Sequence, residues 1–330
     1  MKTWLGQLRS VSWTQEKIVL LIAIAMFCVF SVFLKEFLSP GNLLTLVRGV
    51  STFGILGVGM AILVIGRGID LAIVAIYAMS AAWTLHLANS GASIPVAMLL
   101  GYLFALSAGV LNGVLIAYFE IPALFATLGM ASLVYGFARF ALVPLYVVYM
   151  PASASSIAWM GSGFVFGAPM PILFFALVAL LAFAFLRFTK PGRFIYAIGD
   201  NFVAARMSGA PVRRIIVLQY SISATIAYLA GMITATAVAS MDTNVANSSM
   251  IYDVILVVVL GGIGLSGGRG GIRNVIFGTL LIGILLNGMT IMDIQYTLQN
   301  IIRSLILLMA IVIDSVINPR DEQIAQQGDI

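Results

Sequence analysis

Long apolar runs separated by short polar connections make up most of this chain. A helix needs about 20 apolar residues to cross a bilayer core of ~30 Å. Runs of about that length lie near residues 18–34, 43–65, 69–88, 95–118, 123–147, 170–187, 215–240, 274–292 and 298–316. A shorter run, 251–265, ends in glycines and is expected either to span or to re-enter. The pattern predicts an all-α, polytopic membrane protein of about ten transmembrane helices, with residues 1–330 forming one transmembrane domain.

Composition strengthens this prediction. Hydrophobic residues make up 62% of the chain and charged residues 9%, with a mean hydropathy of +1.10, whereas soluble domains carry about 25% charged residues. So few charges cannot cover the surface of a soluble protein. The first apolar run is longer than the core of a signal peptide, and no small-residue cleavage site follows it, so we interpret it as a retained span.

The basic residues fall almost entirely on one side of a ten-span chain. That side collects Lys2, Arg9, Lys17, Arg67, Arg187, Lys190, Arg193, Arg206, Arg213, Arg214, Arg269, Arg273 and Arg320. The connections on the other side contain Lys35 alone. Because cytoplasmic connections are enriched in Lys and Arg, we expect a multi-pass membrane protein with residues 1–17 and 318–330 in the cytoplasm. The sequence has no dense basic clusters interleaved with aromatics, so nucleic-acid binding is not expected.

Polar side chains inside the apolar runs are few and therefore informative. Arg48, Arg139 and Arg303 must each reach the interface, pair or line a wet cavity, since a cation at mid-bilayer costs about 2.5–3.5 kcal/mol. Arg139 lies well inside its run and is the functional candidate among the three. The other polar candidates serve either as interhelical contacts or as contacts along a polar pathway, and they are Asp70, Asn112, Gln219 and Asn287.

The chain lacks the residues of most catalytic sites. His86 is the only histidine, so neither a His-based triad nor a histidine-containing metal site is expected. Asp70 and Asp253 could form the facing pair of an intramembrane aspartyl protease, but each lies at the boundary of a run, where a carboxylate more often caps a helix. Cys28 is the single cysteine and can form no intrachain disulfide. We therefore expect neither an enzyme nor a bound metal.

The segment GGIGLSGGRGG, residues 261–271, contains seven glycines and the letters LSGGR, close to the LSGGQ signature of ABC-type ATPases. A phosphate-binding loop requires G-x-x-x-x-G-K-[ST], and no GK[ST] occurs in the chain. Apolar runs flank the segment, whereas that signature belongs to a soluble domain. We interpret the glycines as a break between membrane segments that allows a tight turn and close helix approach. GIGLS (262–266) also echoes GIDLA (68–72), but this offset disagrees with that of two LNG triplets, so no single repeat follows.

The connection 188–214 is the most charged part of the chain. Its segment FVAARMS is predicted to be helical, with Asp200 or Asn201 as N-cap and Gly209 as the stop before Pro211. A connection that only satisfied the charge rule would need no capped helical turn of small residues. The turn therefore suggests docking to a cytoplasmic protein.

Four stretches, in the correct order, resemble the permease subunits of ribose-type ABC sugar importers, a group that also serves xylose, arabinose, galactose and autoinducer-type substrates. GRGIDLAIVAIYAMSA (66–81) looks like the family's G-G-I-D-L-S-V-G, and IPALFATLGMASLVYG (121–136) looks like its P-x-F-I-x-T-L-G-x-x-S-x-x-R-G. GRFIYAIGDNFVAARMSGAPV (192–212) looks like its G-R-x-I-Y-A-x-G-G-N-x-x-A-A-x-x-S-G-I loop, and VVVLGGIGLSGGRGG (257–271) looks like its V-x-L-G-G-x-S-L-x-G-G-x-G.

The resemblance implies an ABC importer permease fold. It implies a homo- or heterodimeric channel that receives a sugar or polyol from a periplasmic binding protein and is driven by a cytoplasmic ATPase. ATP and magnesium would bind to that separate ATPase chain, so no cofactor is expected on this one. The 192–212 stretch is similar to the family's coupling helix, which docks in a cleft of the ATPase. Carried over residue by residue, the resemblance implies coupling roles for Asn201, Ala204, Ala205, Ser208 and Gly209.

The chain departs from the family pattern at several positions. Ala72 and Val74 replace a Ser and a Gly, and Tyr135 replaces an Arg, with Arg139 one turn further on. We predict that Arg139→Ala lowers transport more than Arg48→Ala, and that a charged side chain at 205 or 209 abolishes it without preventing folding. The alternative function is a secondary carrier that acts alone on an ion gradient. Such carriers usually need buried acids, and the acids here lie near the ends of runs.

Overall fold

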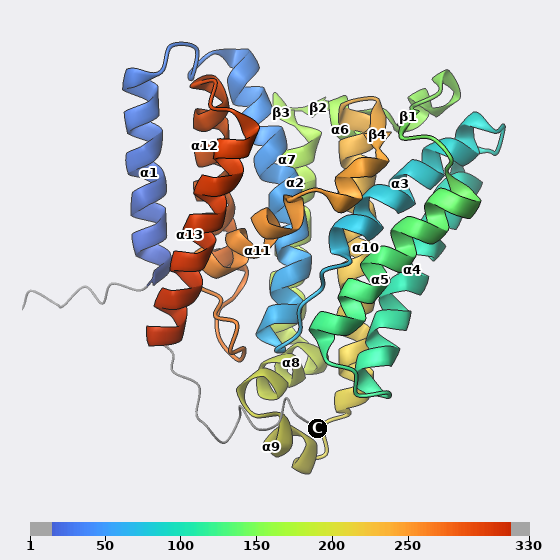
Figure 1. The fold of residues 1–330 in the computed structure, drawn as a ribbon, viewed down its shortest axis with the longest axis vertical. Coiled ribbons are helices and arrows are strands. Elements are labelled where there is room, and N and C mark those ends of the chain that lie inside the picture. The colour runs from blue at the N-terminus through green and yellow to red at the C-terminus, as the bar shows by residue number, and fades with distance from the viewer. Residues whose placement is uncertain (1–14, 318–330) are drawn as a thin grey trace, which may run out of the picture.

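The computed structural model describes residues 15–317 as a bundle of helices that run between two ends of the molecule (Figure 1). Within these residues, seven helices are long and apolar enough to cross a membrane: α1 (Gln15–Phe33), α2 (Pro40–Ile65), α4 (Ile94–Ala117), α5 (Ala123–Phe137, extended by a π-helical turn to Leu142), α7 (Met170–Phe188), α10 (Val212–Ala237) and α12 (Ile272–Ile291). Three shorter apolar helices are α3 (Ile73–Asn89), α11 (Met250–Leu260) and α13 (Tyr296–Ile317). Together they provide the ten segments that the sequence predicts. Most of the predicted tail 1–17 and all of 318–330 lie outside the described residues.

The remaining elements are short and lie at the two ends of the bundle (Figure 1). They are β1 (Val147–Tyr149), α6 (Trp159–Ser162), β2 (Phe164–Val165), β3 (Ala168–Pro169), β4 (Ser240–Asp242), α8 (Lys190–Asp200), α9 (Phe202–Met207) and two 3₁₀ helices, Ala152–Ile157 and Thr243–Asn247. β1 pairs antiparallel with β4, with Val147 opposite Asp242, and β2 pairs with β3 across a tight turn. The strands and α6 lie at one end, whereas α8 and α9 lie at the other, together with the start of α1 and the end of α13.

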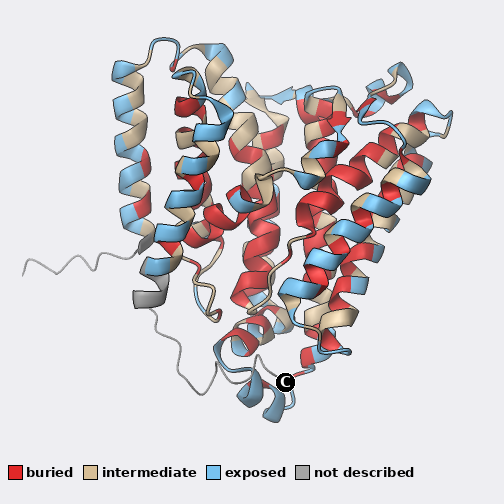
Figure 2. Cartoon of the chain, viewed as in Figure 1, coloured by how far each residue is buried: buried red, intermediate tan, exposed pale blue. Residues whose placement is uncertain are grey.

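The centre of the bundle is built from α2 and α10. The most apolar stretch of α2 is 78% buried and that of α10 is 61% buried, against 11% for α1, which lies at the outside (Figure 2). Glycines allow α2 to be enclosed, since a Cβ on Gly54 would lie 2.5 Å from the Phe175 ring of α7. A Cβ on Gly57 would lie 2.9 Å from Val257 of α11. Close packing around small residues is the usual way in which helices associate inside a membrane.

Two predicted spans have different bounds in the structure. The run expected at 69–88 becomes a non-helical connection, 66–72, followed by α3 from Ile73. The run expected at 123–147 ends its helix at Leu142. The cause is Pro144, because the residue before a proline is pushed out of the helical region, and Val143 has φ −138° and ψ 88°. The chain then leaves the bundle to form β1.

The segment after α10 crosses the bundle. Its β4 strand lies with β1 at one end, whereas the Gly268 N–H donates to the Ile65 carbonyl at the other end (2.8 Å). Between them lie a short 3₁₀ helix, Thr243–Asn247, and the eleven residues of α11, and extended or turning backbone provides the rest of the path (Figure 1). The chain therefore crosses the bundle between residues 240 and 268, and the run 251–265 within it does not re-enter.

Candidate functional site

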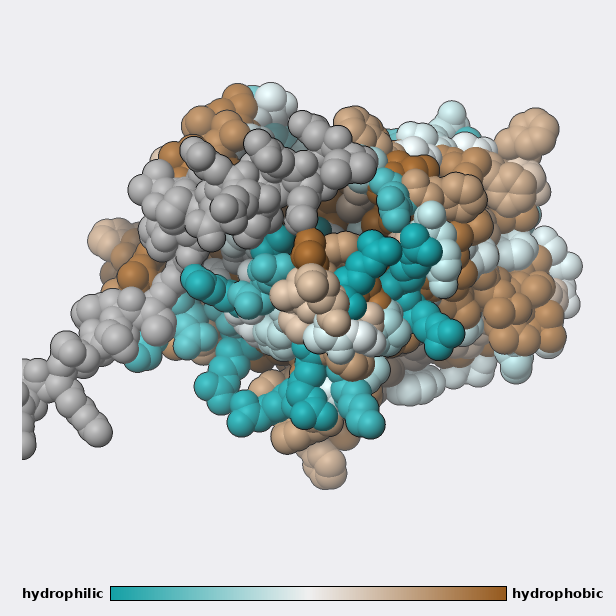
Figure 3. All heavy atoms as spheres, turned by 90° about the horizontal axis from the view of Figure 1, so that it is seen from below, coloured by the Kyte–Doolittle hydropathy of each residue, from teal (hydrophilic) through white to brown (hydrophobic). Residues whose placement is uncertain are grey.

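The connection between α7 and α10 forms two short helices at one end of the bundle, where hydrophilic side chains gather (Figure 3). α8 begins at Thr189, whose Oγ1 accepts the Gly192 N–H at 3.1 Å. Ile195 and Ile198 are buried against the bundle. The pattern-based prediction covers α9 alone, although Thr-Lys-Pro at 189–191 is a helix-start signal.

α9 is closed at both ends by hydrogen bonds. Its N-cap is Asn201 rather than Asp200, because the Asn201 Oδ1 accepts the Ala204 N–H at 2.9 Å. At its far end the N–H groups of Gly209 and Ala210 donate to the carbonyls three and five residues earlier, at 3.1 and 3.2 Å. This is a Schellman motif, and Gly209 has the left-handed φ of +82° that the motif requires. The predicted helix, N-cap and stop are confirmed.

Most of α9 faces outward. The predicted coupling residues Asn201, Ala204, Ser208 and Gly209 are exposed, whereas Ala205 is only 4% exposed and packs against the bundle. Large apolar side chains that the sequence argument did not select are exposed as well: Phe202 (36%), Val203 (40%) and Met207 (83%). Apolar side chains gathered on the polar end of a membrane protein form a surface suited to a protein partner.

The C-terminal ends of α2 and α11 form the same kind of turn. The Gly68 N–H donates to the carbonyl five residues earlier (2.8 Å), and the Ile263 N–H does the same (3.1 Å). The left-handed residue is Arg67 (φ +64°) in the first turn and Gly262 (φ +94°) in the second. The echoed pentapeptides GIDLA and GIGLS thus begin the return of the chain at the same end of the bundle. An L-residue such as Arg67 adopts this conformation at a cost of roughly 1–2 kcal/mol.

The glycine turn, residues 261–271, packs backbone to backbone against α2 and α8. A Cβ on Gly199 would lie 1.9 Å from the Ile65 carbonyl oxygen, and one on Gly268 would lie 2.8 Å from the Asp200 nitrogen. No side chain larger than hydrogen fits at these two positions without movement of the backbone. These contacts confirm that the glycines serve a tight turn and close approach.

Arg67 connects the same three segments through its guanidinium. Its Nε donates to the carbonyls of Gly199 (2.6 Å) and Ser266 (2.9 Å), and its Nη2 donates to that of Asp200 (2.8 Å). The carbonyls of Gly199 and Asp200 end α8, where a helix has acceptors without partners and a partial negative charge. From the sequence, Arg67 is recognised only as a positive charge near the membrane surface. Its position between two glycines at the end of an apolar run is the sequence signal that could have placed Arg67 in a tight turn.

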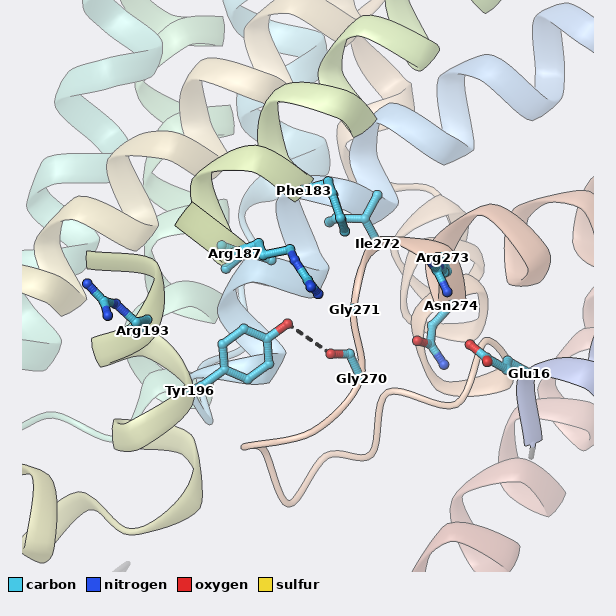
Figure 4. Close-up of a pocket in the computed structure, with 11 residues that line it drawn as sticks. Glu16, Phe183, Arg187, Arg193, Tyr196, Gly270, Gly271, Ile272, Arg273 and Asn274 are labelled. Atoms are coloured by element: carbon cyan, nitrogen blue, oxygen red, sulfur yellow. Dashed lines mark hydrogen bonds between the residues drawn. The ribbon is translucent and has the colours of Figure 1, made fainter. Parts of the chain in front are cut away.

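A cavity of about 440 Å³ opens beside the glycine turn (Figure 4). Arg187 points toward the turn, and the Tyr196 hydroxyl donates to the Gly270 carbonyl at 2.9 Å. Burial raises the pKa of the Tyr196 phenol, so this group stays protonated and keeps its donor. Arg273 and Glu16 lie on the opposite wall. The cavity shows that α8, α12 and the first turn of α1 meet at this end.

Asp70, Asn112 and Gln219 lie at contacts between helices, and none is more than 2% exposed. Asp70, in the connection 66–72, accepts the N–H of Ala72 at 2.9 Å. Ala72 is the N-cap of α3, so Asp70 orders the turn before this helix and is not its cap. Asn112 and Ser223 approach the same carboxylate at 3.5 and 3.4 Å. Gln219 donates to a carbonyl of α2 at 2.8 Å. The three side chains join the connection and α2 to α4 and α10.

Asn287 and Arg139 lie at the opposite end of the bundle. Asn287 exchanges two hydrogen bonds with Asn42, at 2.7 and 3.0 Å, which join α12 to the start of α2. Arg139 donates to the Val143 carbonyl (3.2 Å), and its guanidinium carbon lies 4.1 Å from the centroid of the Tyr146 ring. The expectation that Arg139 lies well inside a span is wrong, because the helix ends at Leu142.

The two aspartates considered for a protease pair have separate partners. Asp70 contacts α4 and α10, whereas Asp253 of α11 forms a buried ion pair with Arg303 of α13. Arg303 thus pairs within the bundle, one of the three possibilities open to it. Across residues 15–317, no three His, Cys, Asp or Glu side chains gather as a metal site would require.

Comparison with known proteins finds relatives along most of the chain. The family model described as a branched-chain amino acid transport system permease component matches residues 42–311, most of the chain. The chain belongs to this permease family.

Individual relatives cover most of the chain. The ribose import permease protein RbsC of Haemophilus influenzae is 32% identical, over 90% of this permease and 91% of the relative. RbsC of Escherichia coli K12 is 29% identical, over 92% and 95%. The probable ABC transporter permease protein YphD of the same strain is 31% identical, over 97% of each chain. No solved structure matches the permease.

Family membership identifies the chain as the permease subunit of an ABC importer and as a multi-pass membrane protein. It is a transport subunit and not an enzyme, and the stand-alone carrier is not supported. The resemblance found in the four motifs is confirmed along most of the chain. The permease has α8 and α9 at one end of the bundle and the paired strands at the other.

Proposed function

We propose that the permease imports a sugar or a related polyol across the bacterial inner membrane. Relatives that cover most of the chain are named for ribose and galactofuranose, both of which are sugars. The description of the matching family model names branched-chain amino acids. We favour the sugar class because the four sequence motifs resemble the ribose-type group. In this proposal a periplasmic binding protein delivers the substrate at the end that carries the paired strands.

The end that carries α8 and α9 faces the cytoplasm in this proposal and receives the ATPase. The observation that carries this assignment is α9 itself, a capped helix whose exposed surface includes Phe202, Val203 and Met207. Asn201 and Gly209 fix its two ends, Ala204 and Ser208 contribute to the contact, and Ala205 holds α9 against the bundle. ATP and magnesium bind to the ATPase chain. A second permease copy, of the same or a different chain, completes the channel within the bilayer.

The position of Ala205 decides which substitution tests the docking. A glutamate at 205 would be buried, so Ala205→Glu would disturb the packing of α9 as well as its surface. Met207 is 83% exposed, so Met207→Glu changes the surface and leaves the packing intact. We expect Met207→Glu to reduce co-purification of the ATPase by about tenfold or more, as the loss of an interface hot spot does. ATP-driven uptake of labelled ribose into vesicles that contain the full importer should fall with it.

The matched control is Phe166→Glu, which alters an exposed aromatic side chain at the opposite end of the bundle. This variant should retain the ATPase. Unchanged ATPase co-purification with Met207→Glu would contradict the docking role of α9. Uptake of leucine instead of ribose by the complete importer would contradict the sugar class.

A further inference from the structure

The docking helix α9 packs mainly against α8. It follows α8, whose C-terminal residues Gly199 and Asp200 contact the end of α2 and the glycine turn. Three backbone segments therefore meet at one point. These are the end of α8, the connection 66–72 between α2 and α3, and the glycine turn between α11 and α12.

We propose that Arg67 transmits movement of the ATPase-docking helices to these two turns between transmembrane segments, on the basis that the ATPase docks at α9 as proposed above. The guanidinium holds two carbonyls of α8 and one of the glycine turn. Arg67 belongs to the connection 66–72 itself. A displacement of α8 thus acts on α2 and α3 through the Arg67 backbone and on α11 and α12 through Ser266.

The contacts around Arg67 leave little room for α8 to move alone. A Cβ on Gly199 would lie 1.9 Å from the Ile65 carbonyl oxygen, and the Gly268 N–H bonds the same carbonyl at 2.8 Å. Backbone contact resists a push of α8 toward the other two segments, because packed protein is nearly incompressible, but it does not resist withdrawal of α8. The hydrogen bonds of Arg67 to Gly199 and Asp200 resist that withdrawal. The bond from Tyr196 of α8 to Gly270 adds a second connection to the glycine turn (2.9 Å).

The backbone conformation of Arg67 allows its side chain to be removed by substitution without straining the backbone. Its φ of +64° lies in the left-handed region that glycine adopts without steric cost. Arg67→Gly therefore removes the guanidinium and relieves the backbone conformation at the same time. Arg67→Lys keeps a positive charge, but one ammonium group cannot reproduce the planar fork that reaches carbonyls on two segments.

Hydrogen exchange in the permease–ATPase complex tests the proposal, with a non-hydrolysable ATP analogue as the probe. In the natural chain the analogue should change exchange in both 190–209 and 261–271. In Arg67→Gly the change should persist in 190–209 and fall by about fivefold or more in 261–271, which corresponds to the low end of coupling between sites. Arg67→Lys should give an intermediate value. The control Arg214→Ala, which removes an exposed arginine at the start of α10, should match the natural chain.

Each result has a distinct meaning. A full response of 261–271 in Arg67→Gly would overturn the proposal and leave Arg67 as a structural contact. A natural chain that responds in 190–209 but not in 261–271 would overturn it too. No response in 190–209 of the natural chain would instead reject the docking of the ATPase at α9, and the transmission with it. Thermal unfolding of each variant, measured alongside, excludes a general loss of folding as the cause.

Discussion

In the structure Arg48, and not Arg139, is the arginine that lies deep within a span. Arg48 lies eight residues into α2, about 12 Å from its outer end at 1.5 Å per residue. Its Nε is enclosed without a partner among the described residues, one turn from the Thr52 hydroxyl, which lies 3.1 Å from that of Thr234 in α10. At that depth a guanidinium needs water or a polar path inside the protein. Arg139 has its contacts at the end of a span.

These positions reverse the expectation drawn from the sequence. We now expect Arg48→Ala to lower uptake by the complete importer by roughly tenfold, which corresponds to about 1.4 kcal/mol. Arg139→Ala should cost about 0.5 kcal/mol of stability or less, as substitutions near a surface do, with little effect on uptake. Uptake and the amount of folded protein in the membrane are measured for both variants. A larger loss for Arg139→Ala would restore the earlier expectation.

The turns between transmembrane helices have defined hydrogen bonds and contacts, as the helices themselves do. The connection 66–72 and the glycine turn close with the same hydrogen-bond pattern, and both meet the end of α8. The glycine turn resembles a nucleotide loop only in its letters. The backbone of α8 occupies the space of a side chain at Gly268, and that of α12 does so at Gly261. Gly262, Gly267, Gly268 and Gly270 also adopt the left-handed φ that glycine accepts without steric cost.

Gly199→Ala tests this backbone contact. The new Cβ would lie 1.9 Å from the Ile65 carbonyl oxygen, and rotation of a side chain cannot relieve a clash between backbone atoms. We expect destabilisation of about 1–3 kcal/mol or more, seen as a lower midpoint of thermal unfolding in detergent. Gly136→Ala in α5 is the matched control, because its Cβ would meet nothing within 4 Å. It should be neutral or stabilising by up to about 1 kcal/mol, since alanine is the better helix former. Equal midpoints for the two variants would argue against the close approach.

The whole molecule has two chemically different ends, and we propose from the distribution of Lys and Arg that the α8–α9 end faces the cytoplasm. The start of α1 and the end of α13 lie at that same end (Figure 1). The opposite end carries the short strands and exposed aromatic side chains, of which Phe166 is fully exposed. This arrangement fits an importer that meets a binding protein on one face and an ATPase on the other.

Orientation can be measured by labelling single cysteines. Cys28→Ser provides a cysteine-free chain, because Cys28 is the only cysteine. In that background a membrane-impermeant maleimide should label Phe166→Cys in intact spheroplasts. Val203→Cys, on the surface of α9, should react only after the membrane is permeabilised. The reverse pattern would invert the proposed orientation.

The sequence alone determined the all-α membrane architecture, the ten segments and the capped helix α9. Each of these depends on local properties: the length of apolar runs, the distribution of charge, and the short-range preferences of Asn201 and Gly209. The bounds of α5 were also within reach, because Pro144 marks the end of its helix. Only the tertiary structure decided that 251–265 crosses the bundle, that Ala205 faces inward and that Arg67 joins three segments. Those features depend on contacts between residues far apart in the chain, and no local pattern records which backbone will lie against which.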